Sequence, residues 1–440
     1  MSITNFDPLM SEMATVQLTR RKGQVCEIGS SVLSVKGLQM FASVGDLVEI
    51  ASKNGTICLG EVLGFSQDCA TILPEYGTGG ASLGDLVELV GDNGIAPDQT
   101  WLGRVVDPFG RPLDDRPLFR GKKQFDLRAS PPPAASRRRL GRRLPTGLAA
   151  FNTFFPVLQG QRLGLFAGSG VGKSTLIADL AKGLEAEVVV LALIGERGRE
   201  LRGFLEDVLS AEGLKRAVVI AATSDQSPMI RRRAAWTAMA VAEYFRDLGA
   251  HVLFLADSIT RFAEAHREIA TATGEAASLR GFPPSTSQTI MELCERAGPG
   301  PEGSGDITAV LSVLVAGSDM DEPIADIVRG VLDGHIVLDR KIAEAGRFPA
   351  IDVLRSVSRS LPEAATDEEN ALLSLARQRM GDFSQAELMI KAGLYKDGTD
   401  AKVDEAIETR PKLEVFLAQK GHQDIETSFA RLKTCLELGG

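Results

Sequence analysis

The sequence has little of several features that would restrict its class of function. Its five cysteines are odd in number and widely spaced, without a Cys-x-x-Cys pair, so they predict neither a disulfide framework nor a zinc site. The four histidines also lack metal-ligand spacing. The longest apolar runs, such as Val188–Ile194 and Val310–Val315, are too short to span a bilayer, and no basic-then-apolar leader opens the chain. We therefore expect a cytoplasmic globular protein with reduced cysteines.

Basic residues are also fewer than acidic residues. The formal net charge is −9, and aromatic residues make up only 5% of the chain. A protein that grips nucleic acid over its whole surface would carry the opposite charge, so we expect no nucleic-acid partner. The chain does have 44% hydrophobic residues over 440 positions, which is enough for two or three domains with a large buried core.

The stretch LGLFAGSGVGKSTLI, residues 163–177, has the pattern of a phosphate-binding loop. A short apolar run precedes the glycines and a helical pattern follows them, which is the context that such a loop requires. Glycines let backbone N–H groups approach an anion, the lysine adds a charge for the β- and γ-phosphates, and the serine hydroxyl supplies an oxygen to Mg²⁺. We therefore predict nucleotide binding; the alternative is a glycine-rich turn without a ligand. The predicted binding residues are Gly168, Ser169, Gly170, Val171, Gly172, Lys173, Ser174 and Thr175.

Apolar runs alternate with helical patterns from Arg162 to about Val337, as in the layers of a parallel α/β sheet. The runs are continuously apolar, which is typical of strands that are covered on both faces. The expected strands are Leu163–Ala167, Val188–Ile194, Ala217–Ala222, His251–Ala256 and Ile307–Val315. The centre of the chain is therefore predicted to be an α/β domain.

Different patterns flank this centre. Short β-type runs separated by turns predict a small closed β domain before it, with strands at Gln24–Ile28, Val32–Val35, Leu47–Ile50, Thr56–Phe65, Thr71–Leu73 and Leu86–Val90. Helical patterns follow Ser360 and predict five helices, at Glu368–Met380, Ser384–Ala392, Ala401–Glu408, Lys412–Gln419 and Asp424–Leu436. The chain should thus have a β domain, an α/β core and a helical domain in that order.

The remaining segments are predicted to be irregular. Trp101–Pro117 is rich in glycine and proline and is interpreted as a connection with a tight turn at Asp107–Gly110. Arg128–Pro145 is interpreted as an extended basic linker whose charges are solvated, the alternative being contact with an anionic partner. Its basic cluster consists of Arg137, Arg138, Arg139, Arg142 and Arg143. Met1–Gln17 is either a frayed tail or a docking segment.

Two carboxylates follow apolar strands at positions suited to nucleotide hydrolysis. Glu196 comes just after the run Val188–Ile194, at the strand end where ligands of open α/β sheets gather. It could deprotonate an attacking water, although an exposed loop carboxylate paired with Arg197 or Arg199 is the alternative. Asp257 ends HVLFLAD and is predicted to hold Mg²⁺ through the metal's water shell, although an aspartate there could also cap a helix.

These motifs together resemble a known family. The phosphate loop, LIGERGRE, VLFLADSITRFAEAHRE and DEPIADIVRGVLDGHIVLDRKIAEAGRFPAIDVLRSVSR are similar to the export ATPases of bacterial flagella and type III secretion systems. That family is related to the catalytic subunit of the rotary F-type ATP synthase, and the resemblance extends from about residue 20 to 440. It implies a small β-barrel, a RecA-like ATPase core and a C-terminal helical domain. The implied boundaries are 1–20 for a docking segment, 21–95 for the barrel, 96–360 for the core and 361–440 for the helices.

The resemblance also implies roles for single residues. Lys173 and Ser174 would bind the phosphates of ATP and Mg²⁺, Glu196 would polarise the attacking water with support from Arg197, and Asp257 would be the metal-side carboxylate. Arg359, at the end of SVSR, matches the arginine finger that is offered to a neighbouring subunit. Phe348 matches an aromatic residue that lies against adenine. From the residues alone, Arg359 would be interpreted as a solvated surface arginine.

The partners implied by the resemblance form an export apparatus. They are a homohexameric ring of this chain, a stator-like regulator at the N-terminal segment, a stalk protein in the ring pore, export chaperones and their substrates, and a membrane export gate. The protein would be cytoplasmic and peripherally associated with the inner membrane. The flagellar apparatus is preferred, with an injectisome as the alternative.

Two further classes of function stay open from the sequence. One is a non-catalytic nucleotide-binding ring subunit, against which the carboxylate at Glu196 argues. The other is an RNA translocase similar to transcription termination factor Rho, which also joins a small β domain to a RecA-like core. The negative net charge and the helical C-terminal region argue against the RNA translocase.

Overall fold

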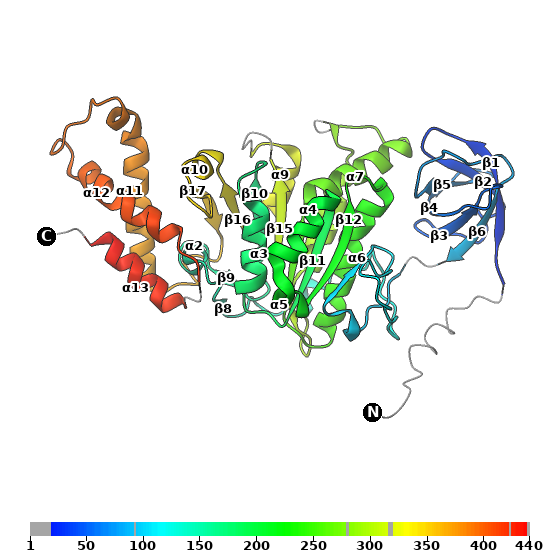
Figure 1. Ribbon diagram of the computed structural model, residues 1–440, viewed down its shortest axis with the longest axis horizontal. Coiled ribbons are helices and arrows are strands. Elements are labelled where there is room, and N and C mark those ends of the chain that lie inside the picture. The colour runs from blue at the N-terminus through cyan, green and yellow to red at the C-terminus, as the bar shows by residue number, and fades with distance from the viewer. Residues whose placement is uncertain (1–18, 92–93, 279–280, 316–319, 422–423, 438–440) are drawn as a thin grey trace.

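A computed structural model describes residues 19–91, 94–278, 281–315, 320–421 and 424–437. The three predicted parts follow one another along the long axis (Figure 1), with the barrel at one end, the α/β core in the middle and helices α11–α13 at the other end. Met1–Gln17 lies outside the described residues. None of the helices built by the described residues is both long and apolar enough to cross a membrane.

The N-terminal part is a closed β-barrel with the strand order β1-β2-β5-β4-β3-β6. Alternate residues of the strands point inward, so that Val25, Val35, Ile50 and Ile72 are almost fully buried. The six predicted strands are all present, within a few residues at each end. Their bounds are β1 Lys22–Ile28, β2 Leu33–Lys36, β3 Leu47–Ala51, β4 Ile57–Phe65, β5 Ala70–Pro74 and β6 Leu86–Gly91.

The core is a nine-stranded sheet with the order β17-β16-β10-β15-β13-β11-β12-β7, to which β14 adds by pairing with β15. All five predicted central strands are present, and they pair in parallel. Four further strands of this sheet, β7, β14, β16 and β17, were not predicted. The bounds are β7 Arg104–Val106, β10 Arg162–Ala167, β11 Val188–Glu196, β12 Ala217–Thr223, β13 Val252–Asp257, β14 Gly298–Pro299, β15 Asp306–Leu314, β16 Gly334–Leu338 and β17 Ile351–Ser358.

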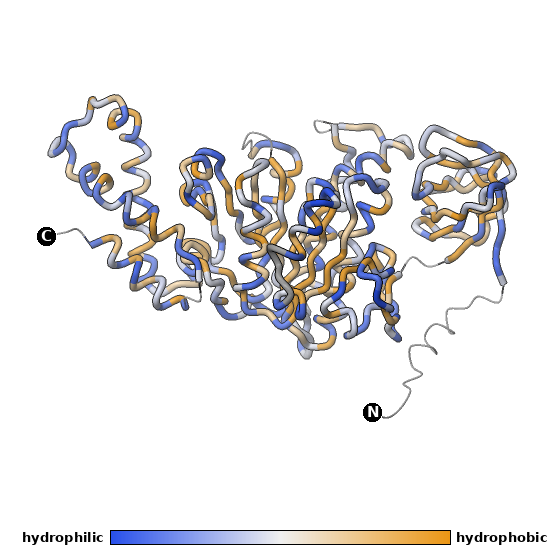
Figure 2. The backbone as a smooth tube through the Cα atoms, in the orientation of Figure 1, coloured by the Kyte–Doolittle hydropathy of each residue, from blue (hydrophilic) through white to orange (hydrophobic). Residues whose placement is uncertain are grey.

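Helices cover both faces of this sheet, which explains why its strands are continuously apolar (Figure 2). In β11, Val189, Leu191 and Leu193 pack toward α3, whereas Val190 and Ala192 pack toward α6 and α7. Strand pairing and packing on two sides therefore hold the carboxyl end of each central strand in place. The helices of the core are α2 Ala149–Asn152, α3 Lys173–Gly183, α4 Gly198–Gly203, α5 Ser210–Lys215, α6 Pro228–Asp247, α7 Ile259–Ala272, α8 Ser285–Arg296, α9 Pro323–Val331 and α10 Arg340–Glu344, and a π-helical turn, Phe204–Leu209, joins α4 to α5.

The described residues of the C-terminal region form three helices where the sequence predicted five. They are α11 Asp367–Lys391, α12 Ala401–Leu417 and α13 Ile425–Leu436. The predicted break after Met380 is wrong because α11 continues through Gly381, and the break before Lys412 is wrong because α12 continues through Pro411. An internal proline costs a helix about 3 kcal/mol. Here Leu413 and Phe416, which follow Pro411, are buried in the same apolar cluster as α11 and α13, and this packing offsets the cost.

The basic linker is solvated only in part. Arg139 and Arg142 are exposed, as predicted, whereas three other arginines of the cluster pair with acidic residues that are distant in sequence. Arg137 pairs with Glu295, Arg138 with Asp306 and Arg143 with Glu369, at N–O distances of 3.3, 2.7 and 3.1 Å. These acidic partners lie more than 150 residues further along the chain. The predicted connection at Trp101–Pro117 likewise contains strand β7, although the predicted turn is present, with Gly110 N–H donating to Asp107 O at 3.0 Å.

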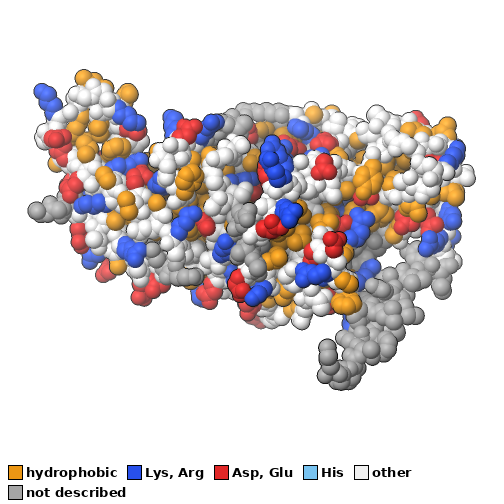
Figure 3. All heavy atoms as spheres, in the orientation of Figure 1, with side chains coloured by type: hydrophobic (Ala, Val, Ile, Leu, Met, Phe, Trp, Pro, Cys, Tyr) orange, Lys and Arg blue, Asp and Glu red, His pale blue; other side chains and the backbone are white. Residues whose placement is uncertain are grey.

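Charged side chains of both signs are interspersed over the visible face of the molecule (Figure 3). This is consistent with a modest net charge distributed over a folded chain.

Candidate functional site

The phosphate loop lies where strand β10 ends and helix α3 begins. Ala167 is the last residue of β10, and α3 starts at Lys173. Gly172 takes a left-handed conformation with φ of 84°, and a Cβ atom at this position would lie only 3.1 Å from the ring of Phe348. The Val171 side chain is buried and anchors the loop, which leaves its backbone for contacts with a ligand. The local geometry is therefore that of an anion-binding strand-to-helix turn.

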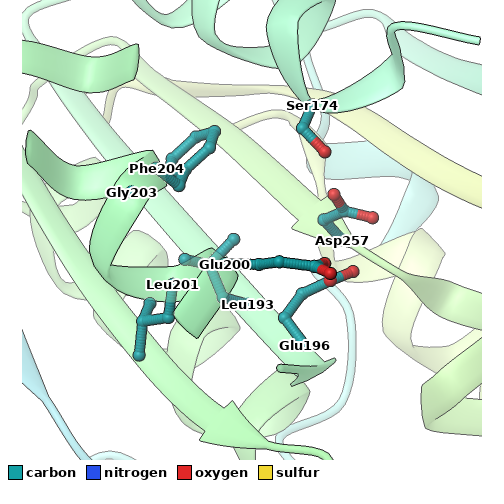
Figure 4. A pocket seen from close by; sticks show the side chains of 8 residues that line it. All are labelled: Ser174, Leu193, Glu196, Glu200, Leu201, Gly203, Phe204 and Asp257. Carbon is teal, nitrogen blue, oxygen red and sulfur yellow. The ribbon is translucent and has the colours of Figure 1, made fainter. Parts of the chain in front are cut away.

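Glu196 and Asp257 lie at the same edge of the sheet as this loop. Strands β10, β15, β13 and β11 are neighbours and run parallel, so their carboxyl ends meet at one edge. Glu196 is the last residue of β11 and Asp257 the last residue of β13, where Asp257 is in register with Leu193. The helix cap that follows is Ser258, whose side chain accepts from the Arg261 N–H, so Asp257 is not used as the cap. Figure 4 shows the Ser174 hydroxyl, the Asp257 carboxylate and the Glu196 carboxylate facing one another.

Lys173 joins these groups electrostatically. Its Nζ atom donates to Asp257 Oδ1 and lies 4.0 Å from Glu196 Oε1. Lys173 and Asp257 are both buried, so neither charge is hydrated well and each depends on the other. A second donor, Ser312 Oγ, reaches Asp257 Oδ1 at 2.7 Å. A cation and two carboxylates are thus concentrated beside the phosphate loop.

The environment of Glu196 suits it to accept a proton. Burial raises the pKa of its carboxyl group, and the charge of Asp257 raises that pKa further, while Lys173 acts in the opposite direction. A carboxylate with a raised pKa is a stronger base than an exposed one and can take a proton from water. The alternative interpretation of Glu196 as an exposed carboxylate therefore does not describe its surroundings: its side chain is 25% exposed, and Arg197 pairs with Glu200 at 3.2 Å.

Two adjoining cavities open at this edge. The larger, of about 710 Å³, is lined by the residues of the phosphate loop other than Val171, by Glu196 and Arg197, and by Thr260 and Arg261. The smaller, of about 410 Å³, is lined by Ser174, Glu196 and Asp257 together with the apolar side chains of Leu193, Leu201 and Phe204. The larger cavity has room for a polyphosphate along the loop and is lined by Glu196, whereas Asp257 lines only the smaller one.

The residues also fit Mg²⁺ that arrives with a nucleotide. Ser174 and Asp257 offer one hydroxyl and one carboxylate to the smaller cavity. Across the described parts of the chain, no group of three or more His, Cys, Asp or Glu side chains could hold a metal by itself. This agrees with the usual behaviour of Mg²⁺, which keeps several waters and takes one or two protein ligands plus substrate phosphates.

Arg359 lies at the opposite end of the strands of the same sheet from the phosphate loop. Strand β17 runs antiparallel to β16, so Ile351 pairs with Leu338 near the phosphate loop, whereas Ser358 pairs with Gly334 at the far end. Gly334 and Leu338 are four positions apart on β16, which is about 13 Å at about 3.3 Å per residue. Arg359 follows Ser358; its backbone N–H donates to Asp333 O at 3.0 Å, and its exposed side chain donates to Arg329 O at 3.1 Å. It is therefore separated from the phosphate loop of its own chain.

Known proteins resemble this chain both in sequence and in structure. Residues 147–358 match the nucleotide-binding domain of the ATP synthase alpha/beta family, and residues 365–434 match the T3SS EscN ATPase C-terminal domain. The flagellum-specific ATP synthase of Caulobacter vibrioides is 43% identical over 94% of this chain and 96% of the relative. The type 3 secretion system ATPase of Xanthomonas euvesicatoria is 40% identical over 94% and 93%. The chain belongs to this family of flagellum-specific and type III secretion ATPases.

Solved structures agree with the sequence matches. The assembled ATPase EscN of the enteropathogenic E. coli type III secretion system superposes on this ATPase with a TM-score of 0.87 and 35% identity, covering 94% of this chain and 100% of EscN. EscN in complex with its central stalk EscO gives a TM-score of 0.83 at 36% identity. The predicted fold class and recognition are confirmed, and the C-terminal match distinguishes this ATPase from the RNA-translocase alternative.

Several residues of the site were not singled out from the sequence. Glu200 and Phe204 line the smaller cavity, and Ser224 and Glu264 line the larger one. Ser312 contacts Asp257 from a neighbouring strand. The segment DSITR, residues 257–261, begins at the last residue of β13 and was a usable signal for Thr260 and Arg261. Nothing in the local pattern around Ser312 indicates that it faces the site.

Proposed function

We propose that this ATPase is the subunit of a homohexameric ring in the flagellar protein export apparatus, where hydrolysis drives chaperone release and substrate export. The proposal rests on one observation: the candidate catalytic residues of this chain lie at two opposite ends of the sheet. Lys173, Ser174, Glu196 and Asp257 meet at one edge of the sheet, while Arg359 lies at the other. A ring provides the arrangement in which the arginine of one subunit completes the site of the next.

The residues take the following roles in ATP hydrolysis. Backbone N–H groups of the loop 168–172 and the Lys173 ammonium hold the β- and γ-phosphates, for which Lys173 must turn from Asp257 toward the nucleotide. Ser174 would hold Mg²⁺ directly, and Asp257 would hold it through water. Mg²⁺ neutralises charge on the phosphates when bound.

Glu196 takes the proton of the attacking water, which its raised pKa favours. Arg197 lines the same cavity and supports the water or the phosphate from the solvent side. Phe348, whose ring lies against Gly172 and is 44% exposed, offers a stacking surface for adenine next to the loop.

The partners follow from the relatives rather than from contacts within this chain. EscN is described as assembled and as binding the central stalk EscO, and we propose a similar ring and stalk here. A stator-like regulator at Met1–Gln17, export chaperones with their substrates and a membrane export gate complete the proposal. The protein would then be cytoplasmic and peripherally attached to the inner-membrane apparatus.

The flagellar assignment rests on the relatives named flagellum-specific, which reach 43% identity against 40% for the Xanthomonas type 3 secretion ATPase. The test is to place Lys173→Ala in the chromosome of the source bacterium and to measure flagellar and effector secretion separately. Loss of flagellar filaments and hook proteins with intact effector secretion supports the proposal. The reverse pattern would move the ATPase to an injectisome.

The ring itself is tested in solution. ATP hydrolysis per milligram should rise with protein concentration, because a monomer lacks an arginine at its site. The oligomeric state is measured over the same range by light scattering. Constant specific activity across the range in which the ring dissociates would contradict a site that is shared between subunits.

A further inference from the structure

The hydrogen bond between Ser312 and Asp257, which the sequence did not predict, joins two neighbouring strands of the sheet. Ser312 lies on β15, the strand between the phosphate-loop strand β10 and the Asp257 strand β13. Its side chain is fully buried, and its Oγ atom donates to Asp257 Oδ1 at 2.7 Å. A buried hydroxyl is costly unless it is hydrogen-bonded. Asp257 thus satisfies Ser312, and Ser312 constrains Asp257.

The carboxyl end of β15 is tied to both sides of the nucleotide site. Leu165 of β10 is in register with Ser312, and Val315 N–H donates to Ala167 O, next to the phosphate loop, at 3.1 Å. Two residues after Ser312, Leu314 N–H donates to Thr260 Oγ1, at the start of α7, at 2.8 Å. The Ser312 hydroxyl is therefore held by a strand whose position both the loop and α7 determine.

The two side chains that donate hydrogen bonds to Asp257 differ in their freedom to move. Within the described chain, the Asp257 side chain accepts hydrogen bonds from Lys173 and Ser312. Both reach the same atom, Oδ1, so the second oxygen, Oδ2, remains for other contacts. Lys173 has a long flexible side chain and leaves Asp257 when it turns to phosphate. Ser312 has a short side chain on a buried strand and stays.

We propose that Ser312 is a positioning residue for the Mg²⁺·nucleotide complex: it holds Asp257 by Oδ1, so that Oδ2 faces the water shell of the metal beside Ser174. This rests on the proposed roles of Asp257 and Ser174. A partner that orients a metal-side carboxylate typically changes metal affinity or activity by about 10- to 100-fold when it is removed. Ser312 acts through Asp257 and does not touch the nucleotide.

The variants separate positioning from packing. Ser312→Ala removes the donor, Ser312→Thr keeps a hydroxyl, and Ser312→Cys replaces it by a weak donor of similar size in case the alanine variant folds poorly. Thr308→Ala is the matched control. Thr308 is a fully buried hydroxyl residue on the same strand, but it contacts His251 and the Gly160 N–H instead of Asp257.

The measurement is ADP binding by calorimetry, with Mg²⁺ and with a chelator, together with the Mg²⁺ concentration for half-maximal hydrolysis. In Ser312→Ala and Ser312→Cys we expect the affinity for ADP in chelator to be unchanged. The gain in ADP affinity that Mg²⁺ produces should be about tenfold smaller, and the Mg²⁺ concentration for half-maximal hydrolysis should be about tenfold higher. Ser312→Thr should restore both values to near those of the parent. Thr308→Ala should lower thermal stability without changing the Mg²⁺-dependent gain.

Two outcomes would overturn the inference. If Ser312→Ala and Ser312→Cys keep the parental Mg²⁺-dependent gain, or if Thr308→Ala loses as much of it, the hydroxyl of Ser312 serves packing alone. If the parent protein itself shows no Mg²⁺-dependent gain, the proposed metal roles of Ser174 and Asp257 fail, and the role of Ser312 fails with them. The parent measurement distinguishes these two failures.

Discussion

The two ends of the strands of the central sheet hold charged side chains in different settings. At the carboxyl edge of the parallel strands, Lys173 and Asp257 are buried and paired, with Glu196 beside them. At the other edge, Arg359 is exposed and its side chain contacts a backbone carbonyl. Buried paired charges are preorganised for chemistry inside one chain. An exposed arginine on the far side is available to a second chain, as the proposed ring requires.

The largest effect is expected at the carboxyl edge. Lys173→Ala removes the charge for the β- and γ-phosphates and leaves Asp257 buried without its cation, so nucleotide binding or turnover should be lost. Lys182→Ala, on the exposed end of the same helix, is the control and should hydrolyse ATP normally. Equilibrium nucleotide binding and steady-state phosphate release measure the two steps. Near-parental hydrolysis by Lys173→Ala would contradict the assignment of the nucleotide site to the phosphate loop.

The far edge is tested by Arg359→Ala. An arginine finger stabilises charge in the transition state and is worth about 10³ to 10⁵ in rate, so this variant should bind ATP and hydrolyse it very slowly. Lysine should not replace it, because an ammonium lacks the planar fork. Arg340→Ala is the control, because Arg340 is exposed and forms an ion pair with Glu344 within the same helix.

Mixing the two inactive variants sharpens the comparison between the edges. Some interfaces in a mixed ring pair an intact phosphate loop with an intact Arg359, so Lys173→Ala and Arg359→Ala together should recover part of the hydrolysis. Subunit exchange is checked by labelling each variant with a different fluorophore. Exchange without recovery, combined with an active Arg359→Ala protein, would show that the arginine has no role in trans.

A smaller effect is expected for Glu196→Gln. The amide keeps the shape of the side chain but cannot take a proton, so binding should persist while turnover falls by about a hundredfold or more. Single-turnover hydrolysis and nucleotide affinity are measured on the same preparation. A variant that neither binds ATP nor keeps its thermal stability would assign Glu196 a structural role.

The smallest effect is the pH dependence of the parent enzyme. Burial and Asp257 raise the pKa of Glu196, and the base is active only when deprotonated. Consequently kcat/KM, which reports the free enzyme, should fall as pH is lowered, with an acid limb above the range of an ordinary glutamate. The profile is measured from about pH 5 to about pH 8. A flat profile down to the lower limit would mean that Glu196 is not the titrating base.

Much of the fold could be predicted because its signals are local. The continuous apolar runs identified the five central strands, and alternation with turns identified the six strands of the barrel. The β17 strand escaped prediction because its apolar residues do not alternate with polar ones: Leu354 and Val357 are apolar but exposed. The two wrong helix breaks came from applying local rules at Gly381 and Pro411, where packing between helices outweighs propensity.

The sequence by itself determined the chemistry of the phosphate loop, since Gly172, Lys173 and Ser174 are adjacent and their roles depend on a single strand-to-helix turn. Tertiary structure alone decided which distant groups meet. It paired Arg137 with Glu295, set Ser312 beside Asp257 and placed Arg359 at the far edge of the sheet. The physical reason is that strand order and register are settled by burial and backbone pairing over the whole sheet, and a local pattern of residues does not encode contacts across it.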